Sequence, residues 1–187
     1  MSSERWVGLA TPQLREAAVE LEGEIYRNEH GFAPPAEEGA VYFVATRGTD
    51  EVVASFRILG PSFRPFDLER FCSLDFLPRN RRPGLIGRLC VSSSYRDLKQ
   101  QAGLHPAMMR LAFNYSVEVG ITDLVLYSFS NLVGFYKRAM FRETGLSFVH
   151  PGYEQTMTVL WLDLDAAIKS MERGDRRSLL LYGQPIS

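Results

Sequence analysis

The sequence has little cysteine, no long hydrophobic run and no excess of charge of one sign. Its two cysteines, Cys72 and Cys90, are too few for the disulfide framework of a small secreted protein. No apolar run approaches the ~20 residues that span a bilayer, and the first residues lack the apolar core of a signal peptide. The 21 Lys and Arg residues nearly balance the 22 Asp and Glu residues, so no global field favours nucleic acid. We therefore expect a cytoplasmic protein without a membrane span and without a nucleic-acid partner.

The composition is that of an ordinary globular protein. Hydrophobic residues make up 45% of the 187 residues, and 12% are aromatic. A chain of this length is typical of one domain. We found no internal repeat and no linker composition. We expect a single domain over residues 1–187, with a core over about 10–165 and a C-terminal helix and tail over 166–187.

Hydrophobic periodicity predicts both helices and strands. Apolar residues at three- and four-residue spacing predict helices over 11–30, 106–119 and 131–140, and shorter helices over 67–74 and 165–172. Alternating or continuous apolar runs predict strands over 40–46, 51–59, 85–91, 123–128, 141–149 and 155–163. This order predicts an α/β (α+β) fold, a mixed sheet with helices on both faces.

The segment over 85–119 has the layout of an anion site. A buried strand leads through a polar loop containing Gly103 directly into a helix. The free N–H groups and the positive dipole end of the first helical turn both favour a bound anion. Arg96 and Lys99 add positive charge for a pyrophosphate or a phosphopantetheine phosphate. The alternative is an ordinary connection between a strand and a helix.

From about residue 10 to residue 165 the chain resembles the GNAT-type N-acyltransferases. The donor-binding loop of that family carries Gln/Arg-x-x-Gly-x-Gly/Ala. Here Gln100 and Gly103 match its first two anchors, and His105 replaces the last small residue. The helix after the next strand in that family ends in a Tyr followed by a Gly-Phe pair. Tyr136 matches the tyrosine, whereas Met140 stands in place of the glycine.

Further stretches resemble one branch, the acyl-homoserine-lactone synthases and the related N-acyl amino acid synthases. In these proteins one arginine ends the first hairpin and another lies where the fourth strand enters the donor site; Arg57 and Arg88 match them. The lactone synthases pair the second arginine with a glutamate three residues earlier, where this chain has Leu85. The resemblance implies a GNAT-like, mostly antiparallel mixed sheet. It also implies N-acyl transfer from an acyl-CoA or acyl-ACP (acyl carrier protein) thioester to a small-molecule amine or peptide acceptor.

The resemblance also implies a donor site along the fourth strand and the helix after it. In this fold the fourth strand splays from the fifth, and its main-chain N–H groups bind the pantetheine arm and the thioester carbonyl. The residues expected to line this site are Leu89, Cys90, Val91, Ser92, Arg96, Gln100, Gly103, Leu104 and His105.

The catalytic candidates are Tyr136, Arg57, Arg88 and Glu69. A phenol can protonate a leaving thiolate, so Tyr136 is the candidate general acid; the alternative is a buried structural tyrosine. Glu69 is a candidate base, and its alternatives are plain surface charge and proton loss through water. Arg57 and Arg88 lie in apolar strands, where an unpaired guanidinium is costly. One interpretation is an internal ion pair for each, with Glu69 or Asp67 as the partner. The alternative is that one of the two arginines binds an acceptor carboxylate or orders the acceptor loop.

Other features bear on metals and partners. No cluster of His, Cys and carboxylate residues has the spacing of metal ligands, so we expect no metal. A basic run before the donor strand is either a docking patch for an acidic acyl carrier protein or a solvated loop. Its members are Arg79, Arg81 and Arg82, with Arg96 and Lys99 beyond them. The apolar run over 179–182 packs either on the domain or on a second copy in a homodimer.

We conclude from the sequence that the protein is an N-acyltransferase. It is expected to move a fatty acyl group from an acyl-CoA or carrier-protein thioester to the amine of an amino acid or peptide. An acetyl-CoA-dependent N-acetyltransferase is a second interpretation. A catalytically silent module that binds acyl thioesters is a third, because His105, Phe129 and Met140 depart from the motifs of the family.

Overall fold

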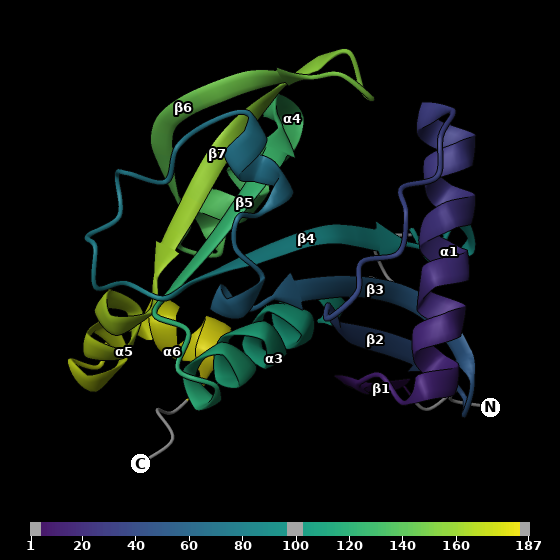
Figure 1. Ribbon diagram of the computed structural model, residues 1–187. Helices are drawn as coiled ribbons and strands as arrows, with labels where there is room; N and C mark the ends of the chain where they lie inside the picture. Colours follow the sequence, from purple (N-terminus) through teal and green to yellow (C-terminus); the bar gives the residue numbers. More distant parts are fainter. Residues whose placement is uncertain (1–4, 97–102, 184–187) are drawn as a thin grey trace. The chain divides into compact units, whose positions relative to one another are not determined.

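The computed structural model describes residues 5–96 and 103–183, and hydrogen bonding connects seven strands in the order β1-β2-β3-β4-β5-β7-β6 (Figure 1). The strands are β1 (Arg5–Leu9), β2 (Val41–Arg47), β3 (Glu51–Leu59), β4 (Pro83–Val91), β5 (Asp123–Phe129), β6 (Arg142–His150) and β7 (Gln155–Asp163). The α-helices are α1 (Pro12–His30), α3 (Leu104–Glu118), α4 (Ser130–Arg138), α5 (Leu164–Glu172) and α6 (Arg176–Tyr182). Short 3-10 helices are η1 (Pro61–Phe63), η2 (Asp67–Arg70) and η3 (Ser93–Tyr95).

The predicted fold class is confirmed. β1 pairs with β2, β2 with β3, β5 with β7 and β6 with β7, all antiparallel. The pairing of β4 with β5 is parallel and runs from Pro83↔Asp123 to Leu85↔Val125. The sheet is therefore mixed and mostly antiparallel, as the resemblance implied.

The chain forms two compact units. The first unit comprises Met1–Ile58 and Gly87–Ala112, and the second comprises Leu59–Ile86 and Phe113–Ser187. β4 and α3 each contribute residues to both units. The single domain expected from length stays a prediction.

In the first unit, α1 packs against β2 and has the ends that its sequence predicts (Figure 1). The Thr11 hydroxyl accepts a hydrogen bond from the Leu14 N–H at 3.3 Å, and Pro12 occupies the first turn. Gly31 ends the helix with φ +77°, a conformation that glycine adopts without strain. The covered face of α1 is unusual because Glu22 is buried on it, next to Gly23.

The N-terminal strand β1 was not predicted. Its residues pair with β2 from Arg5↔Arg47 to Leu9↔Phe43. The segment is short, and Gly8 interrupts its apolar pattern. It becomes a strand because β2 offers it an edge to pair with.

In the second unit, α4 packs against β5, β6 and β7, and α5 packs against α6. The apolar run expected over 179–182 forms most of α6. Its Tyr182 ring stacks on Phe113 at 4.4 Å between centroids, and its hydroxyl donates to the Ala139 carbonyl. This side chain therefore packs within its own unit. The helix expected over 67–74 is wrong in its extent, because η2 ends at Arg70.

The described residues lack both a membrane-spanning helix and a group of metal ligands. No helix among them combines the length and apolar character that crossing a membrane requires. The same residues hold no group of three or more His, Cys, Asp or Glu side chains arranged to bind a metal ion.

Candidate active site

The main chain of β4 is strained at the point where the donor site is expected. Arg88 adopts φ +55°, in the left-handed region that side-chain-bearing residues rarely enter. Such a residue inside a strand redirects the backbone that follows it, and it persists only where the surroundings hold it. Three predicted donor-site residues, Leu89, Cys90 and Val91, come directly after it.

The end of β4 is tied to its neighbours in the first unit. The Ser92 N–H donates to the Val53 carbonyl at 2.9 Å, so this predicted donor-site amide already has a partner. The Val91 carbonyl accepts from Arg96 Nε at 3.0 Å, and the Arg96 guanidinium also pairs with Glu29. Arg96 thus closes the strand end.

Cys90 is buried in β4 at 2% exposure. Burial raises the pKa of its thiol to about 12. The thiol therefore stays protonated at neutral pH, which makes it a poor nucleophile.

The start of α3, where an anion site is predicted, is described from Gly103 onward. Gly103 has φ +82°, and its carbonyl accepts from the Ala107 N–H at 3.1 Å. Leu104 is the first helical residue and is buried. His105 follows it, half-buried, and burial lowers the pKa of its imidazole, which favours the neutral ring. The predicted site residue Gln100 and the neighbouring Lys99 lie outside the described residues.

Arg57 and Arg88 are brought together in the first unit by two carboxylates. Arg57 Nη2 lies 2.6 Å from Glu37 Oε2. Arg88 Nη1 lies 2.5 Å from Glu22 Oε1, and its Nη2 lies 3.2 Å from Glu37 Oε1. The internal ion pairs are confirmed, but the expected partner Glu69 or Asp67 is wrong, because α1 and the segment before β2 supply the carboxylates. We call these four side chains the buried charge network.

Polar groups without partners surround the buried charge network. Tyr42 and Arg57 are cross-strand neighbours, and Ser55 lies two residues before Arg57, so their side chains share one face of the sheet. Within the described residues, five buried atoms of this region have neither a hydrogen-bond partner nor an ion-pair partner: Glu22 Oε2, Tyr42 Oη, Ser55 Oγ, Arg57 Nε and Arg57 Nη1. Such atoms are costly to bury unless a polar ligand or water meets them. Arg57, at 1% exposure, therefore keeps unused donors.

The other two catalytic candidates belong to the second unit. Tyr136 is half-buried on α4, in edge contact with the rings of Phe135 and Phe141. Met140, which stands where the resemblance expects glycine, adopts φ +69°, so this turn retains the conformation that favours glycine.

Glu69 is engaged in a way that disfavours proton uptake. Its carboxylate accepts both Nε and Nη2 of Arg64, at 2.9 and 2.5 Å, and the Phe66 N–H at 3.0 Å. The hydrogen bonds from Arg64 lower the pKa of Glu69. Its catalytic role stays a prediction, and the geometry favours a structural one.

Sequence reasoning missed an aromatic cluster in the second unit, which gathers around His150. Its ring lies 4.3 Å from that of Tyr153, 5.6 Å from Phe71 and 5.9 Å from Tyr127, and Phe71 stacks on Phe148 at 4.7 Å. The Gly152 N–H donates to His150 Nδ1 at 3.1 Å, which places the proton of the neutral ring on Nε2. Phe148 and His150 share one face of β6, a period-two signal that was present in the sequence.

The expected basic docking patch is partly wrong. Arg81 is not available to a partner, because it pairs with Asp123, Asp163 and Asp165. Arg79 and Arg82 remain exposed.

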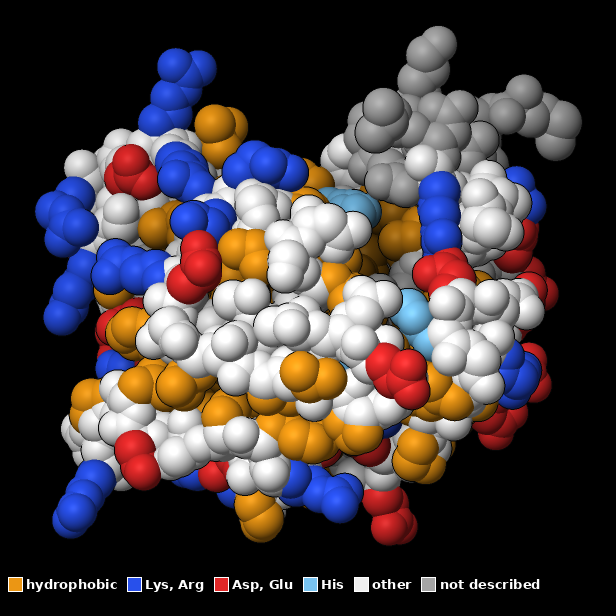
Figure 2. All heavy atoms as spheres, turned by 90° about the horizontal axis from the view of Figure 1, so that it is seen from above, with side chains coloured by type: hydrophobic (Ala, Val, Ile, Leu, Met, Phe, Trp, Pro, Cys, Tyr) orange, Lys and Arg blue, Asp and Glu red, His pale blue; other side chains and the backbone are white. Residues whose placement is uncertain are grey.

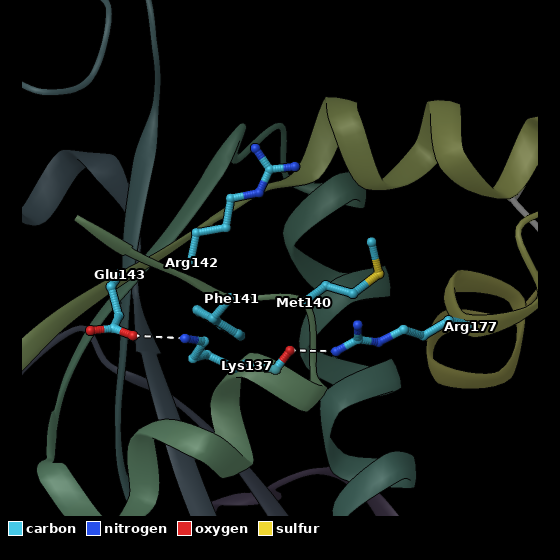
Figure 3. A pocket seen from close by; sticks show the side chains of 6 residues that line it. All are labelled: Lys137, Met140, Phe141, Arg142, Glu143 and Arg177. Carbon is cyan, nitrogen blue, oxygen red and sulfur yellow. Dashed lines mark hydrogen bonds and ion pairs between the residues drawn. The ribbon is translucent and has the colours of Figure 1, made fainter. Parts of the chain in front are cut away.

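Three cationic side chains line a pocket of about 390 Å³ in the second unit (Figure 3). It is lined by Lys137, Met140, Phe141, Arg142, Glu143 and Arg177. Lys137 pairs with Glu143 at 2.9 Å, and Arg177 donates to the Lys137 carbonyl, whereas Arg142 extends away from these contacts in Figure 3. Figure 2 shows that Lys and Arg side chains also gather toward one edge of the face in view.

Comparisons with known proteins place this geometry in a fold. No protein-family model matches the sequence, and no curated protein matches it. Among solved structures, FeeM, an N-acyl amino acid synthase from uncultured soil microbes, matches with a TM-score of 0.72 at 11% identity, over 88% of this chain and 94% of its own. The AHL synthase LasI matches with a TM-score of 0.71 at 15% identity, over 100% of this chain and 98% of its own.

An acyl-CoA N-acyltransferase from Pseudomonas aeruginosa matches with a TM-score of 0.61 at 16% identity, over 84% of this chain and 97% of its own. The three proteins are named as a synthase of N-acyl amino acids, a synthase of AHL and an N-acyltransferase. The match covers nearly the full length of each of them. The chain therefore has a GNAT-like α/β fold, which it shares with the N-acyl amino acid synthase FeeM and the AHL synthase LasI.

Proposed function

We propose that the protein is an N-acyltransferase that moves a fatty acyl group from a phosphopantetheine thioester to the amine of an amino acid or peptide. The observation that carries the proposal is the left-handed Arg88 inside β4, immediately before Leu89–Val91. A strained residue at that point, in a chain with this fold, supports a main chain shaped to bind a thioester carbonyl.

The reaction needs two groups from the protein besides the bound substrates. The acceptor nitrogen, neutral after losing a proton to water, attacks the thioester carbon, and a C–N bond forms. Main-chain N–H groups of Leu89–Val91 stabilise the tetrahedral oxyanion. The nitrogen of the intermediate then releases its second proton to solvent, the C–S bond breaks, and an acid protonates the departing thiolate and regains its proton from solvent; Tyr136 is the residue that the sequence predicts for this role. The products are an amide and a free thiol, so atoms and charges balance.

Arg57 is the better candidate for the acceptor carboxylate. The Arg88 guanidinium contacts Glu22, Glu37 and the Pro35 carbonyl. Arg57 instead retains two buried nitrogens without a partner among the described residues. An arginine with unused, desolvated donors binds a carboxylate strongly. This supports an amino acid acceptor rather than a simple amine.

We base the proposed donor, a CoA or carrier-protein thioester, on the anion-binding character of the start of α3. The phosphate of a CoA or carrier-protein thioester would meet the start of α3 at Gly103, Leu104 and His105. A carrier protein, a cytoplasmic location and a homodimer remain part of the proposal.

The experiment is a turnover assay with two donor series and an amine panel. Purified protein is incubated with acetyl-CoA, medium- and long-chain acyl-CoA or acyl-ACP, and each amino acid in turn. Free thiol and N-acyl product are measured, the product by mass spectrometry. We expect thiol release that depends on both a fatty acyl donor and an amino acid, and Tyr136→Phe should slow kcat by about 100-fold.

The same assay separates the alternatives. Turnover with acetyl-CoA that exceeds turnover with every longer donor would identify an N-acetyltransferase. Binding of acyl-CoA without thiol release across the whole panel would identify a silent thioester-binding module. This alternative rests on Met140 and His105, which depart from the motifs of the family.

A further inference from the structure

The carboxylate partner of Arg88 comes from a different element than the resemblance implied. Leu85 occupies the position three residues before Arg88, and it is buried and apolar. The partner is instead Glu22, in the middle of α1, whose Oε1 lies 2.5 Å from Arg88 Nη1. The ion pair therefore connects α1 to β4, over 66 residues of sequence.

The far end of the Arg88 side chain is held on several sides. Nη1 also donates to the Pro35 carbonyl at 2.8 Å, and Nη2 lies 3.2 Å from Glu37 Oε1. At the near end, the Arg88 backbone has φ +55°. A left-handed residue that is not glycine relaxes unless its surroundings over-determine it. The contacts of the guanidinium are such surroundings, because they fix where the side chain points.

Stability alone does not explain Glu22. The residue is 3% exposed, and its Oε2 is buried without a partner among the described residues. Burial raises the pKa of Glu22, against the opposing effect of Arg88. An apolar side chain packed between α1 and the sheet would avoid this penalty, and replacing a buried ion pair by apolar residues is often neutral or stabilising. The ion pair therefore needs another reason.

We propose that Glu22 is a positioning residue that acts through Arg88 to hold the left-handed turn of β4, and so aims the main-chain N–H groups of Leu89–Val91. The proposal rests on the proposed function for its catalytic meaning, since those amides are the ones assigned to the thioester carbonyl. Its structural meaning does not depend on turnover: without the Glu22 carboxylate, the backbone around Arg88 is free to leave its strained conformation.

The first test measures amide hydrogen exchange in the full-length protein. Wild type is compared with Glu22→Gln, which keeps the shape of the side chain and removes its charge, and with Glu24→Gln, an exposed glutamate of the same helix. We expect the peptide covering 87–92 to exchange about tenfold faster in Glu22→Gln only, with peptides from β5–β7 unchanged. Equal exchange of this peptide in all three proteins would overturn the proposal. If Glu22→Gln exchanges faster everywhere, it has lost global stability, and the second test decides.

The second test uses the backbone preference of residue 88. In the Glu22→Gln background, Arg88→Gly and Arg88→Ala both remove the guanidinium, but only glycine enters positive φ without strain. We expect the 87–92 peptide to exchange about fivefold more slowly in the glycine variant than in the alanine variant, and kcat to be about fivefold higher. Equal values for the two variants would refute a positioning role for the ion pair.

The two readouts separate failure of this inference from failure of the proposed function. Donor KM should change less than twofold in Glu22→Gln, while kcat falls by about tenfold, because the amides act mainly in the transition state. A protein that shows the exchange differences but no turnover with any substrate retains the positioning role and loses the proposed activity. The reverse result, turnover that Glu22→Gln leaves unchanged, retains the activity and removes Glu22 from it.

Discussion

Two arginines, Arg81 in the second unit and Arg88 in the first, each pair with more than one carboxylate, yet their surroundings differ. Arg81 Nε and Nη2 contact both oxygens of Asp123 at 2.6 and 2.9 Å, and further bonds reach Asp163 and Asp165. Asp123 also accepts from the Trp161 indole at 2.8 Å. Arg88 pairs with two glutamates, but Glu22 Oε2 and two nitrogens of the adjacent Arg57 are buried without partners in the described parts of the chain.

This difference in hydrogen bonding indicates that the Arg81 network stabilises the fold, whereas the buried charge network keeps polar atoms that can bind a ligand. In the Arg81 network each described carboxylate is met by a donor, and the hydrogen bonds join the loop before β4 to β5, β7 and α5. In the buried charge network the fold tolerates unmet polar atoms and a strained backbone. Natural proteins accept such local penalties chiefly at functional sites. Breaking the first network should therefore reduce stability, and altering the second should reduce activity.

The largest expected effect is on stability, from Arg81→Met. Asp123, at 0% exposure, would lose its main charge partner, and removing one member of a buried pair costs about 3–5 kcal/mol. Urea unfolding should show this loss, while Arg79→Met, at an exposed neighbour, should change the free energy of unfolding by about 0.5 kcal/mol or less. Activity per folded molecule should stay unchanged. A loss below about 1 kcal/mol would mean that the Arg81 network is not structural.

The second largest expected effect is on binding of the amino acid acceptor, and it comes from Arg57→Met. Removing the guanidinium should raise KM for the amino acid by about tenfold or more, equivalent to about 1.4 kcal/mol, and leave donor binding unchanged. Glu37 would keep Arg88 as its partner, so the loss of stability should be smaller than in the Arg81 variant. The comparison would fail if Arg57→Met lowered stability and left KM for the amino acid unaltered.

Opposite pH dependences should distinguish two glutamates, one in each unit. The folded-state pKa of Glu22 is raised above 4.5 by burial, so the stability that Glu22 contributes is greatest below pH 4.5 and is lost as pH rises through the raised pKa. The pKa of Glu69 is lowered by Arg64, so its contribution is present above pH 4.5 and is lost as pH falls.

Unfolding of wild type, Glu22→Gln and Glu69→Gln across acid to neutral pH measures this difference. The advantage of wild type over Glu22→Gln should shrink with rising pH, and its advantage over Glu69→Gln should grow. The second effect should be small, about 1 kcal/mol or less, because the Arg64 side chain is 43% exposed and water screens the ion pair. Slopes of the same sign for the two variants would contradict the assignment.

The smallest effect concerns the two thiols. Cys72 is half-exposed in the second unit, whereas Cys90 is buried in β4 and its pKa is raised to about 12. Brief alkylation of the native protein at pH 8 should label Cys72 in preference to Cys90, as peptide mass mapping would show. Rapid labelling of Cys90 would show that β4 is more open than the structure indicates.

Much of the fold was predictable from local pattern. The caps of α1 and the apolar runs of β3 and β7 were found from the sequence because each depends on neighbouring residues. The strand β1 was missed because it depends on pairing with β2, a contact more than thirty residues away. The left-handed turn at Arg88 was equally invisible, since nothing in the residues around it marks a positive φ.

The site was only partly predictable, for a similar reason. Arg57 and Arg88 were singled out because charges inside apolar strands need partners, and they do have them. The partner Glu22 was overlooked because it lies among exposed glutamates on α1, where a single buried charge has no local signature. Arg81 was assigned to a docking surface because its three aspartates lie forty to eighty residues away in sequence.

The most direct measurement is a structure of the protein with a non-hydrolysable acyl-CoA thioether whose carbonyl group is retained. We predict that the carbonyl oxygen lies within hydrogen-bond distance of a main-chain N–H of Leu89, Cys90 or Val91, with Arg88 still left-handed. An analogue that binds with its carbonyl away from β4, or an Arg88 that leaves positive φ when the analogue is bound, would contradict it.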